Sequence, residues 1–159
     1  MLSKVIKDEY IQLDVQANNF EEAIRKALQP FLEADVVTEK YVETILKIYE
    51  ETGPYIVITE NIALPHATVE SGAKDVAIGF MRLKTPVTSG HRTNDPVKYL
   101  FSLSAKNNQA HIELLSELAN LLGNPDFLKF IKVVSSREEF KNYIEKRSEE
   151  RRVGKECRS

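Results

Sequence analysis

The sequence predicts a single α/β domain in which helices flank one central sheet. Two observations predict this fold. Apolar residues recur at spacings of three and four in several segments, and short β-favouring runs lie between those segments. Helices before, between and after short strands indicate a sheet covered by helices. With 159 residues, 42% hydrophobic and 29% charged, the chain is long enough to bury one substantial core.

The first part of the chain is predicted to form a strand and two amphipathic helices. Residues 10–15 have the composition of a strand. Asn19 and Glu22 form a capping pair, and apolar side chains follow them at helical spacing. Thr38 begins a second helix of the same kind, which ends at Gly53 because Pro54 follows.

The middle of the chain is predicted to supply most of the sheet. The β-favouring runs are residues 55–58, 62–64, 76–83 and 99–104. Residues 84–97 contain Pro, Gly, Asn and Asp, which indicate a loop with turn chemistry. Since loops often carry functional groups, this loop is one place for a site.

The last part of the chain is predicted to be mainly helical. Residues 109–122 have a helical period, and Gly123 is placed as a C-terminal stop. A short helix around 126–131, a strand-like pair at 133–134 and a helix that begins at Ser136 complete the domain.

The composition changes abruptly at residue 147, so we predict one domain over residues 1–146 and a non-native tail over 147–159. The tail, RSEERRVGKECRS, resembles the translation of a sequencing-adapter read-through. Without its five basic and three acidic residues, the domain keeps 17 basic and 21 acidic side chains, a formal charge of −4. This charge argues against nucleic acid as a partner.

Two further classes of protein are excluded by composition. The single cysteine, Cys157, lies in the predicted tail, so the domain has no residue for a disulfide, a thiolate zinc site or a cysteine nucleophile. The N-terminus lacks the apolar core of a signal peptide, and no run of eighteen apolar residues occurs. We therefore expect a cytoplasmic protein whose chemistry depends on histidines, carboxylates or hydroxyls.

His66 is a candidate nucleophile because it stands at the end of a predicted strand. Pro65 ends strand pairing and restricts Leu64 to an extended conformation, so the imidazole is held at a stiff position. Near pH 7 an imidazole is largely neutral, and its free ring nitrogen can attack a phosphoryl group. Spacing alone favours the alternative, an ordinary histidine hydrogen-bonded to backbone.

The other two histidines also lie at junctions. His111 is in the first turn of a predicted helix, where backbone N–H groups and the helix dipole attract anions, although a capping or partly buried histidine fits equally well. His91 is in the turn-rich loop, as a site-lining group or as an exposed histidine without a role. Together, His66, His91 and His111 also offer three ligands to a zinc ion, as in some hydrolytic sites.

Residues around His66 resemble a known family. Asn61–Ala67, in the sequence NIALPHA, resembles the phosphorylation-site segment of the mannitol, fructose and ascorbate class of enzyme IIA domains from the sugar phosphotransferase system. The resemblance covers roughly residues 10 to 145 and is nearest to the ascorbate branch. Its further elements are Tyr41–Glu43, Gly53–Ile58, Gly90–His91, Asn94–Val97, His111 and Leu114–Leu115.

The resemblance implies a mannitol/fructose-type enzyme IIA fold and a phosphoryl relay without cofactor or metal. His66 would be phosphorylated by the carrier protein HPr, and His111 would stabilise the phosphoryl group. The phosphate would then pass to a IIB subunit that serves a IIC membrane permease. His91 matches the pattern as a possible site-lining residue. The alternatives are a phosphorylation-dependent regulatory IIA-like module and a three-histidine zinc hydrolase.

Overall fold

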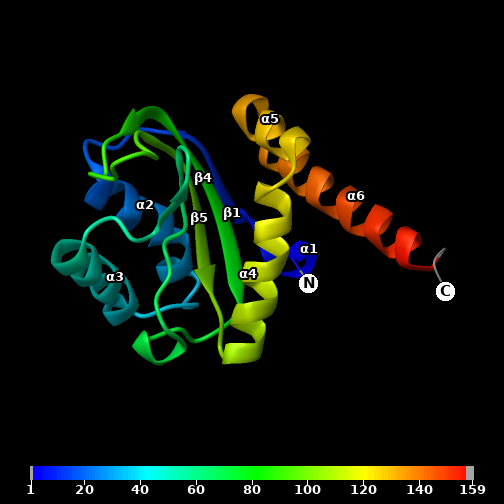
Figure 1. The fold of residues 1–159 in the computed structure, drawn as a ribbon. Helices are drawn as coiled ribbons and strands as arrows, with labels where there is room; N and C mark the ends of the chain where they lie inside the picture. Colours follow the sequence, from blue (N-terminus) through cyan, green and yellow to red (C-terminus); the bar gives the residue numbers. More distant parts are fainter. Residues whose placement is uncertain (1, 157–159) are drawn as a thin grey trace.

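A five-stranded sheet with helices on both faces forms the centre of the protein, as the sequence predicts (Figure 1). The computed structural model describes the backbone of residues 2–156 and the side chains of residues 2–149. In chain order the elements are α1 (Leu2–Val5), β1 (Ile6–Val15), α2 (Phe20–Glu33), α3 (Glu39–Thr52), β2 (Val57–Thr59), β3 (Ile62–Ala63), the 3₁₀ helix η1 (Val69–Ser71), β4 (Ala77–Val87), β5 (Val97–Ser104), α4 (Asn108–Leu122), α5 (Pro125–Val133) and α6 (Arg137–Glu156).

The sheet is mixed, with the strand order β1-β4-β5-β3-β2. The pairs β1–β4 and β3–β5 are parallel, whereas β4–β5 and β2–β3 are antiparallel. Because β3 and β5 run in the same direction, their carboxyl ends lie at one edge of the sheet. The chain leaves β3 toward His66 at this edge, and it leaves β5 there to begin α4.

The two faces of the sheet bury separate apolar clusters. One cluster, which includes Phe31 and Tyr41, lies under α2 and α3. The other is rich in aromatic rings and lies under α4, α5 and α6; its Phe80 stacks on Phe140 at 4.6 Å between centroids. Neighbouring strand residues such as Phe80 and Met81 point into opposite clusters, as the strand period requires.

The predicted helix ends are confirmed where capping groups define them. The side chain of Asn19 accepts a hydrogen bond from the amide of Glu22 at 2.8 Å, as the capping pair predicts. Gly53 ends α3 with a φ of +92°, a conformation that a glycine adopts without steric cost. Ser136 caps α6, since its hydroxyl oxygen accepts from the amide of Glu139.

Three boundaries differ from the prediction. Residues 133–134 are not a strand, because α5 continues through Val133 and Val134 is its C-cap. The β-propensity of two valines is overridden here, since Phe127 and Ile131 reach the core at helical spacing. The predicted loop 84–97 is shorter, because β4 runs to Val87, and the strand predicted at 55–58 is β2 at Val57–Thr59.

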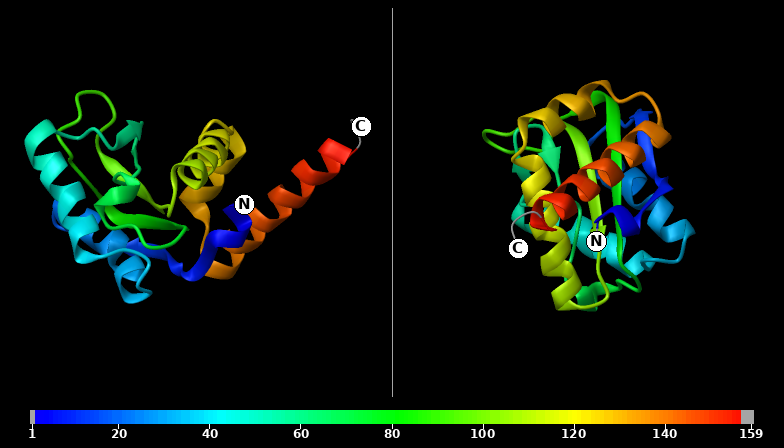
Figure 2. Two further views of the ribbon diagram at one scale, coloured as in Figure 1. Left: turned by 90° about the horizontal axis from the view of Figure 1, so that it is seen from below. Right: turned by 90° about the vertical axis from the view of Figure 1, so that its right-hand side faces the viewer.

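The C-terminal helix extends into the predicted tail. Figure 2 shows the last turns of α6, which ends at Glu156, projecting beyond the rest of the domain. Residues 157–159 and the side chains of residues 150–159 lie outside the described part of the chain, and the foreign origin of 147–159 stays a prediction. Among the described helices, none combines the length and the apolar character that crossing a membrane requires.

Candidate functional site

His66 is the first residue after the backbone hydrogen bonds that hold the end of β3 to its neighbours. The amide of Leu64 donates to the carbonyl of Ile56 at 2.8 Å, and the amide of Leu103 in β5 donates to the carbonyl of Pro65 at 3.1 Å. His66 follows directly, with its side chain partly exposed. The strand-end position predicted from Pro65 is therefore confirmed.

The ring of His66 is oriented by one backbone hydrogen bond. Its Nδ1 lies 2.7 Å from the carbonyl oxygen of Leu64. A carbonyl oxygen only accepts, so Nδ1 carries the proton, and in the neutral ring Nε2 keeps its lone pair. The hydrogen bond to backbone that marks an ordinary histidine thus also fixes the tautomer in which Nε2 is nucleophilic.

His111 lies beside His66, with the two ring centroids 5.7 Å apart. It stands in the first turn of α4, at the edge of a buried stripe formed by Ala110, Leu114 and Leu118. Burial lowers the pKa of His111 below its usual range, and the charge of His66 lowers it further. His111 is therefore neutral at pH 7 and has one ring N–H to donate.

The first turn of α4 adds positive potential at the same edge of the sheet. Asn107 is the N-cap, and its side chain accepts from the amide of Ala110 at 2.8 Å. The amides of Asn108 and Gln109 have no acceptor within the helix, as at any helix start. These groups and the helix dipole favour an anion near the two histidines.

The structure does not bring His91 to this pair. Its Nδ1 accepts from the amides of Thr93 and Asn94 at 3.2 and 3.1 Å, and so shapes the turn in which it lies. The carbonyl of Asn94 accepts from the amide of Asn61, before β3, whereas His66 lies after β3. In β5 the amide of Lys98 donates to the carbonyl of Asn61, and the amide of Leu103 donates to the carbonyl of Pro65. The five steps along the strand from Lys98 to Leu103 separate these positions by about 17 Å.

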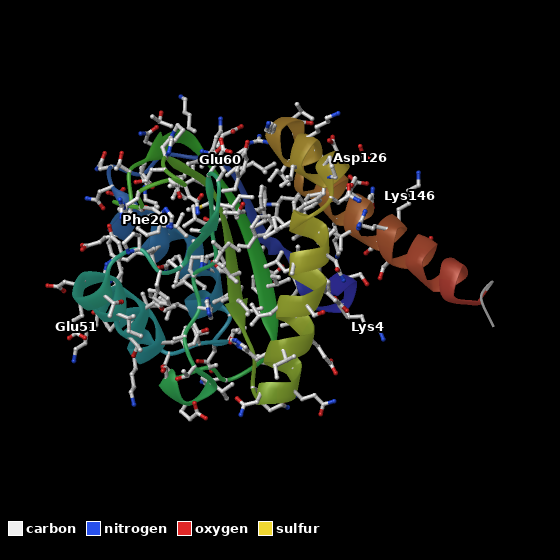
Figure 3. All side chains as sticks on the ribbon, viewed as in Figure 1. Lys4, Phe20, Glu51, Glu60, Asp126 and Lys146 are labelled. Atoms are coloured by element: carbon white, nitrogen blue, oxygen red, sulfur yellow. The ribbon has the colours of Figure 1, made fainter. Side chains whose placement is uncertain are left out.

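Figure 3 labels Glu60, in the turn between β2 and β3, at the end of the sheet opposite to the first turn of α4. The loop of His91 lies near this turn, since Asn61 contacts Asn94. Across the described residues, no group of three His, Cys, Asp or Glu side chains is arranged to hold a metal ion. The three-histidine zinc alternative thus has no support in the geometry.

The loop of His91 is closed by Asp95, as its turn chemistry predicts. The carboxylate accepts from the amides of Ser89 and Gly90 and from the hydroxyl of Ser89. Burial acts to raise the pKa of Asp95, but these hydrogen bonds together lower it below the usual range. The hydroxyl of Tyr49 in α3 donates to the carbonyl of Ser89 at 2.6 Å and ties the loop to that helix.

Two tyrosines at the site lie in segments of the family resemblance, but the sequence predicted no role for them. The hydroxyl of Tyr41 donates to the carbonyl of Leu103 at 2.7 Å and accepts from the amide of Ala67 at 3.0 Å. The hydroxyl of Tyr55 donates to the carbonyl of His66 at 3.2 Å. Tyr41 lies at a core position of its helix. A core position does not need a hydroxyl, so the hydroxyl is the feature that could have indicated a polar role.

Exposed apolar side chains border the histidine pair. Tyr55 is 42% exposed, with its ring centroid 6.3 Å from that of His66, and Ile112, next to His111, is 65% exposed. Ile62 and Leu64, which precede His66, are both buried in the core and take no part in this border. The pair therefore lies open between two apolar groups on different elements, Tyr55 before β2 and Ile112 on α4.

Comparison with known proteins identifies the family. The family described as "Phosphoenolpyruvate-dependent sugar phosphotransferase system, EIIA 2" matches residues 4–147. The chain belongs to this family. It is thus an enzyme IIA component, a phosphotransferase that relays a phosphoryl group through a phosphohistidine in sugar uptake.

Enzyme IIA relatives match over most of the chain. The ascorbate-specific EIIA component of Salmonella choleraesuis (strain SC-B67) is 35% identical over 112 residues, 70% of this chain and 73% of its own. The corresponding component of Escherichia coli (strain K12) is 29% identical over 137 residues, 86% of this chain and 89% of its own.

Solved enzyme IIA structures share the fold. The mannitol-specific cryptic enzyme IIA CmtB from Escherichia coli matches with a TM-score of 0.81 at 26% identity, covering 89% of this chain and 95% of that one. The complex of mannitol enzyme IIA with phosphorylated enzyme IIB from Escherichia coli matches with a TM-score of 0.73 at 27% identity, covering 86% and 95%. The mannitol-type α/β fold expected from the sequence is confirmed.

Proposed function

We propose that Nε2 of His66 accepts the phosphoryl group from phospho-HPr and passes it to a IIB subunit. The observation that carries this assignment is the 2.7 Å contact between Nδ1 of His66 and the carbonyl oxygen of Leu64, with His111 at 5.7 Å between ring centroids. It supports His66 as the nucleophile, because Nε2 is the ring nitrogen left with a lone pair, and it leaves His111 as the neighbouring donor.

The transfer step exchanges one N–P bond for another. The lone pair of Nε2 attacks the phosphorus, the N–P bond of the donor phosphohistidine breaks, and the donor nitrogen keeps the bonding electrons. The Nδ1 proton stays on His66, hydrogen-bonded to the Leu64 carbonyl. When the phosphoryl group moves on to IIB, His66 departs as a neutral imidazole, which makes it a good leaving group.

His111 and the start of α4 would compensate the phosphoryl charge. The ring N–H of His111 can donate to a phosphoryl oxygen, and the amides of the first helical turn present positive potential. A phosphoryl relay needs little beyond alignment and this charge compensation, because both the donor and the product are phosphoramidates. No metal or nucleotide is part of the proposal.

The exposed apolar border supports docking of two protein partners in turn. Tyr55 and Ile112 are the kind of apolar groups that lie at the centre of protein interfaces. The mannitol relative binds phosphorylated IIB, which supports a IIB acceptor here as well. We place this exchange in the cytoplasm beside a IIC permease. Since two relatives are ascorbate components, ascorbate is the first sugar to test.

The test is phosphorylation of the purified protein with phosphoenolpyruvate, enzyme I and HPr. We expect an acid-labile, base-stable adduct that is absent from His66→Ala and retained by the control His91→Ala. A label on His66→Ala would refute the site, and no label on the native protein would refute the relay. Labelled protein that passes no phosphate to any IIB, but binds another protein only when labelled, would instead indicate the regulatory module.

A further inference from the structure

We propose that Tyr41 is a positioning residue that fixes the orientation of His66 through a second anchor on β5. This inference rests on the proposed role of His66 as the phosphorylated residue. It concerns a side chain that touches neither the phosphoryl group nor a partner, since Tyr41 is only 1% exposed.

Two contacts hold the chain to β5, one before His66 and one after it, and both involve the backbone of Leu103. On one side, the amide of Leu103 donates to the carbonyl of Pro65 at 3.1 Å. On the other side, the carbonyl of Leu103 accepts from the Tyr41 hydroxyl at 2.7 Å, and that hydroxyl accepts from the amide of Ala67 at 3.0 Å. The hydroxyl of Tyr41 thus bridges the amide of Ala67 and the carbonyl of Leu103, which would bond directly if the chain continued as a strand.

This geometry requires a hydroxyl and not merely an aromatic ring. The Ala67 amide needs an acceptor and the Leu103 carbonyl needs a donor, and a hydroxyl provides both at once. The contacts are buried, so water does not simply take over when the hydroxyl is lost. Burial also raises the pKa of Tyr41 to about 12, so the group stays protonated, and can donate, throughout the physiological range.

The anchor reaches the imidazole through the backbone. The Nδ1 contact of His66 is made to the carbonyl of Leu64, two residues earlier, so it depends on the backbone conformation of this short segment. With Ala67 released, the segment is held to β5 on one side only. The Tyr55 hydroxyl still contacts the carbonyl of His66. The segment can nevertheless shift and weaken the contact of Nδ1 with the Leu64 carbonyl, so that the proton distributes between the two ring nitrogens.

Tyr41→Phe tests this inference, with Tyr49→Phe as the matched control. Tyr49 lies on the same helix, and its hydroxyl also donates to a backbone carbonyl, that of Ser89 in the remote loop. We expect Tyr41→Phe to lower the saturated rate of phosphorylation by about tenfold to a hundredfold, with the KM for phospho-HPr unchanged. The control should keep both parameters, and equal losses in the two variants would overturn the inference.

The tautomer of His66 gives a readout that does not depend on phosphoryl transfer. In unphosphorylated protein, ¹⁵N chemical shifts should report Nδ1–H for the native chain and for Tyr49→Phe, and a mixture of tautomers for Tyr41→Phe. An unchanged Nδ1–H tautomer in Tyr41→Phe would overturn the positioning role. If the native protein shows the tautomer but accepts no phosphate on His66, the proposed function fails, and these shifts still decide the role of Tyr41.

A further measurement on the native chain covers the case in which Tyr41→Phe does not fold. The Ala67 amide should exchange its hydrogen much more slowly than the same amide in an unstructured peptide, because it is bonded to a buried hydroxyl. Exchange as fast as in the peptide would show that the anchor is not formed, and would overturn the inference.

Discussion

Phosphorylation of His66 should raise the pKa of His111. In the resting protein, burial and the neighbouring His66 lower this pKa. A phosphoryl group on Nε2 replaces a neutral or positive neighbour with an anion, and an anion favours the protonated imidazole. Phosphorylation would thus increase the fraction of His111 that is protonated at a given pH.

The magnitude follows from the separation of the rings. A phosphoryl group carries a charge of about −1.5 to −2 near pH 7. With the 5.7 Å between the ring centroids as the charge separation, Coulomb's law gives about 3 kcal/mol per unit charge at an effective dielectric constant of about 20. Both rings are partly exposed, so solvent screening leaves about 1 kcal/mol, or roughly fivefold in the protonation constant of His111.

The assay is an NMR titration of the His111 ring in resting and phosphorylated protein, over the pH range in which the adduct survives. His91 is the internal control, because it lies at the opposite end of the sheet and its ring signals should not respond to phosphorylation. A pKa of His111 that stays the same or falls on phosphorylation would refute the arrangement in which His111 faces the phosphoryl group.

Three other changes test separate parts of the structure. Ile112→Asp should raise the KM for phospho-HPr about tenfold without lowering the thermal midpoint, because this side chain is 65% exposed; an equal effect from Ser116→Asp, one turn later, would contradict a specific contact. In the native protein the pKa of His111 is lower in the folded chain than in the unfolded chain, where it is near 6.5, so the unfolded chain binds a proton first and the free energy of unfolding decreases as the pH falls. His111→Gln removes this effect, so its free energy of unfolding, measured in urea, should decrease less than that of the native protein between about pH 7.5 and 5.5. Truncation after Lys146 should leave the urea midpoint and the phosphorylation rate unchanged if residues 147–159 are foreign, and a loss above about 2 kcal/mol would contradict this.

Local signals predicted the helices of this fold well. The Asn19 cap and the Gly53 stop each act over three or four residues, so the sequence next to them is sufficient to place the helix end. The strand order was not predicted, because pairing joins segments far apart in the chain, such as β1 with β4. The error at Val133 has a related cause, since two β-branched residues do not reveal that α5 reaches the core at helical spacing.

The candidate site was also predicted only in part from the sequence. His66 and His111 were selected from junction positions and from a family resemblance, and the structure places them side by side. The contact between Tyr41 and Leu103 spans 62 residues, and no periodic pattern carries that information. His91 shows the converse limit, because a histidine in a turn-rich loop has the composition of a site, yet its ring nitrogen is used by its own turn.

The arrangement around His66 fits the proposal that one partly exposed histidine serves two partners. A phosphoryl group that is accepted from one protein and passed to another cannot be enclosed, so contacts to the ring and backbone of the histidine must align it. Leu64 and Tyr55 hold the ring and the backbone of His66, and Tyr41 holds the following residue. All three contacts involve backbone groups, and none of them uses Nε2 of His66. A relay therefore needs both the backbone contacts that fix His66 and the exposed apolar border where partners dock. Loss of the backbone contacts should lower the saturated rate, whereas changes to the border should raise the KM.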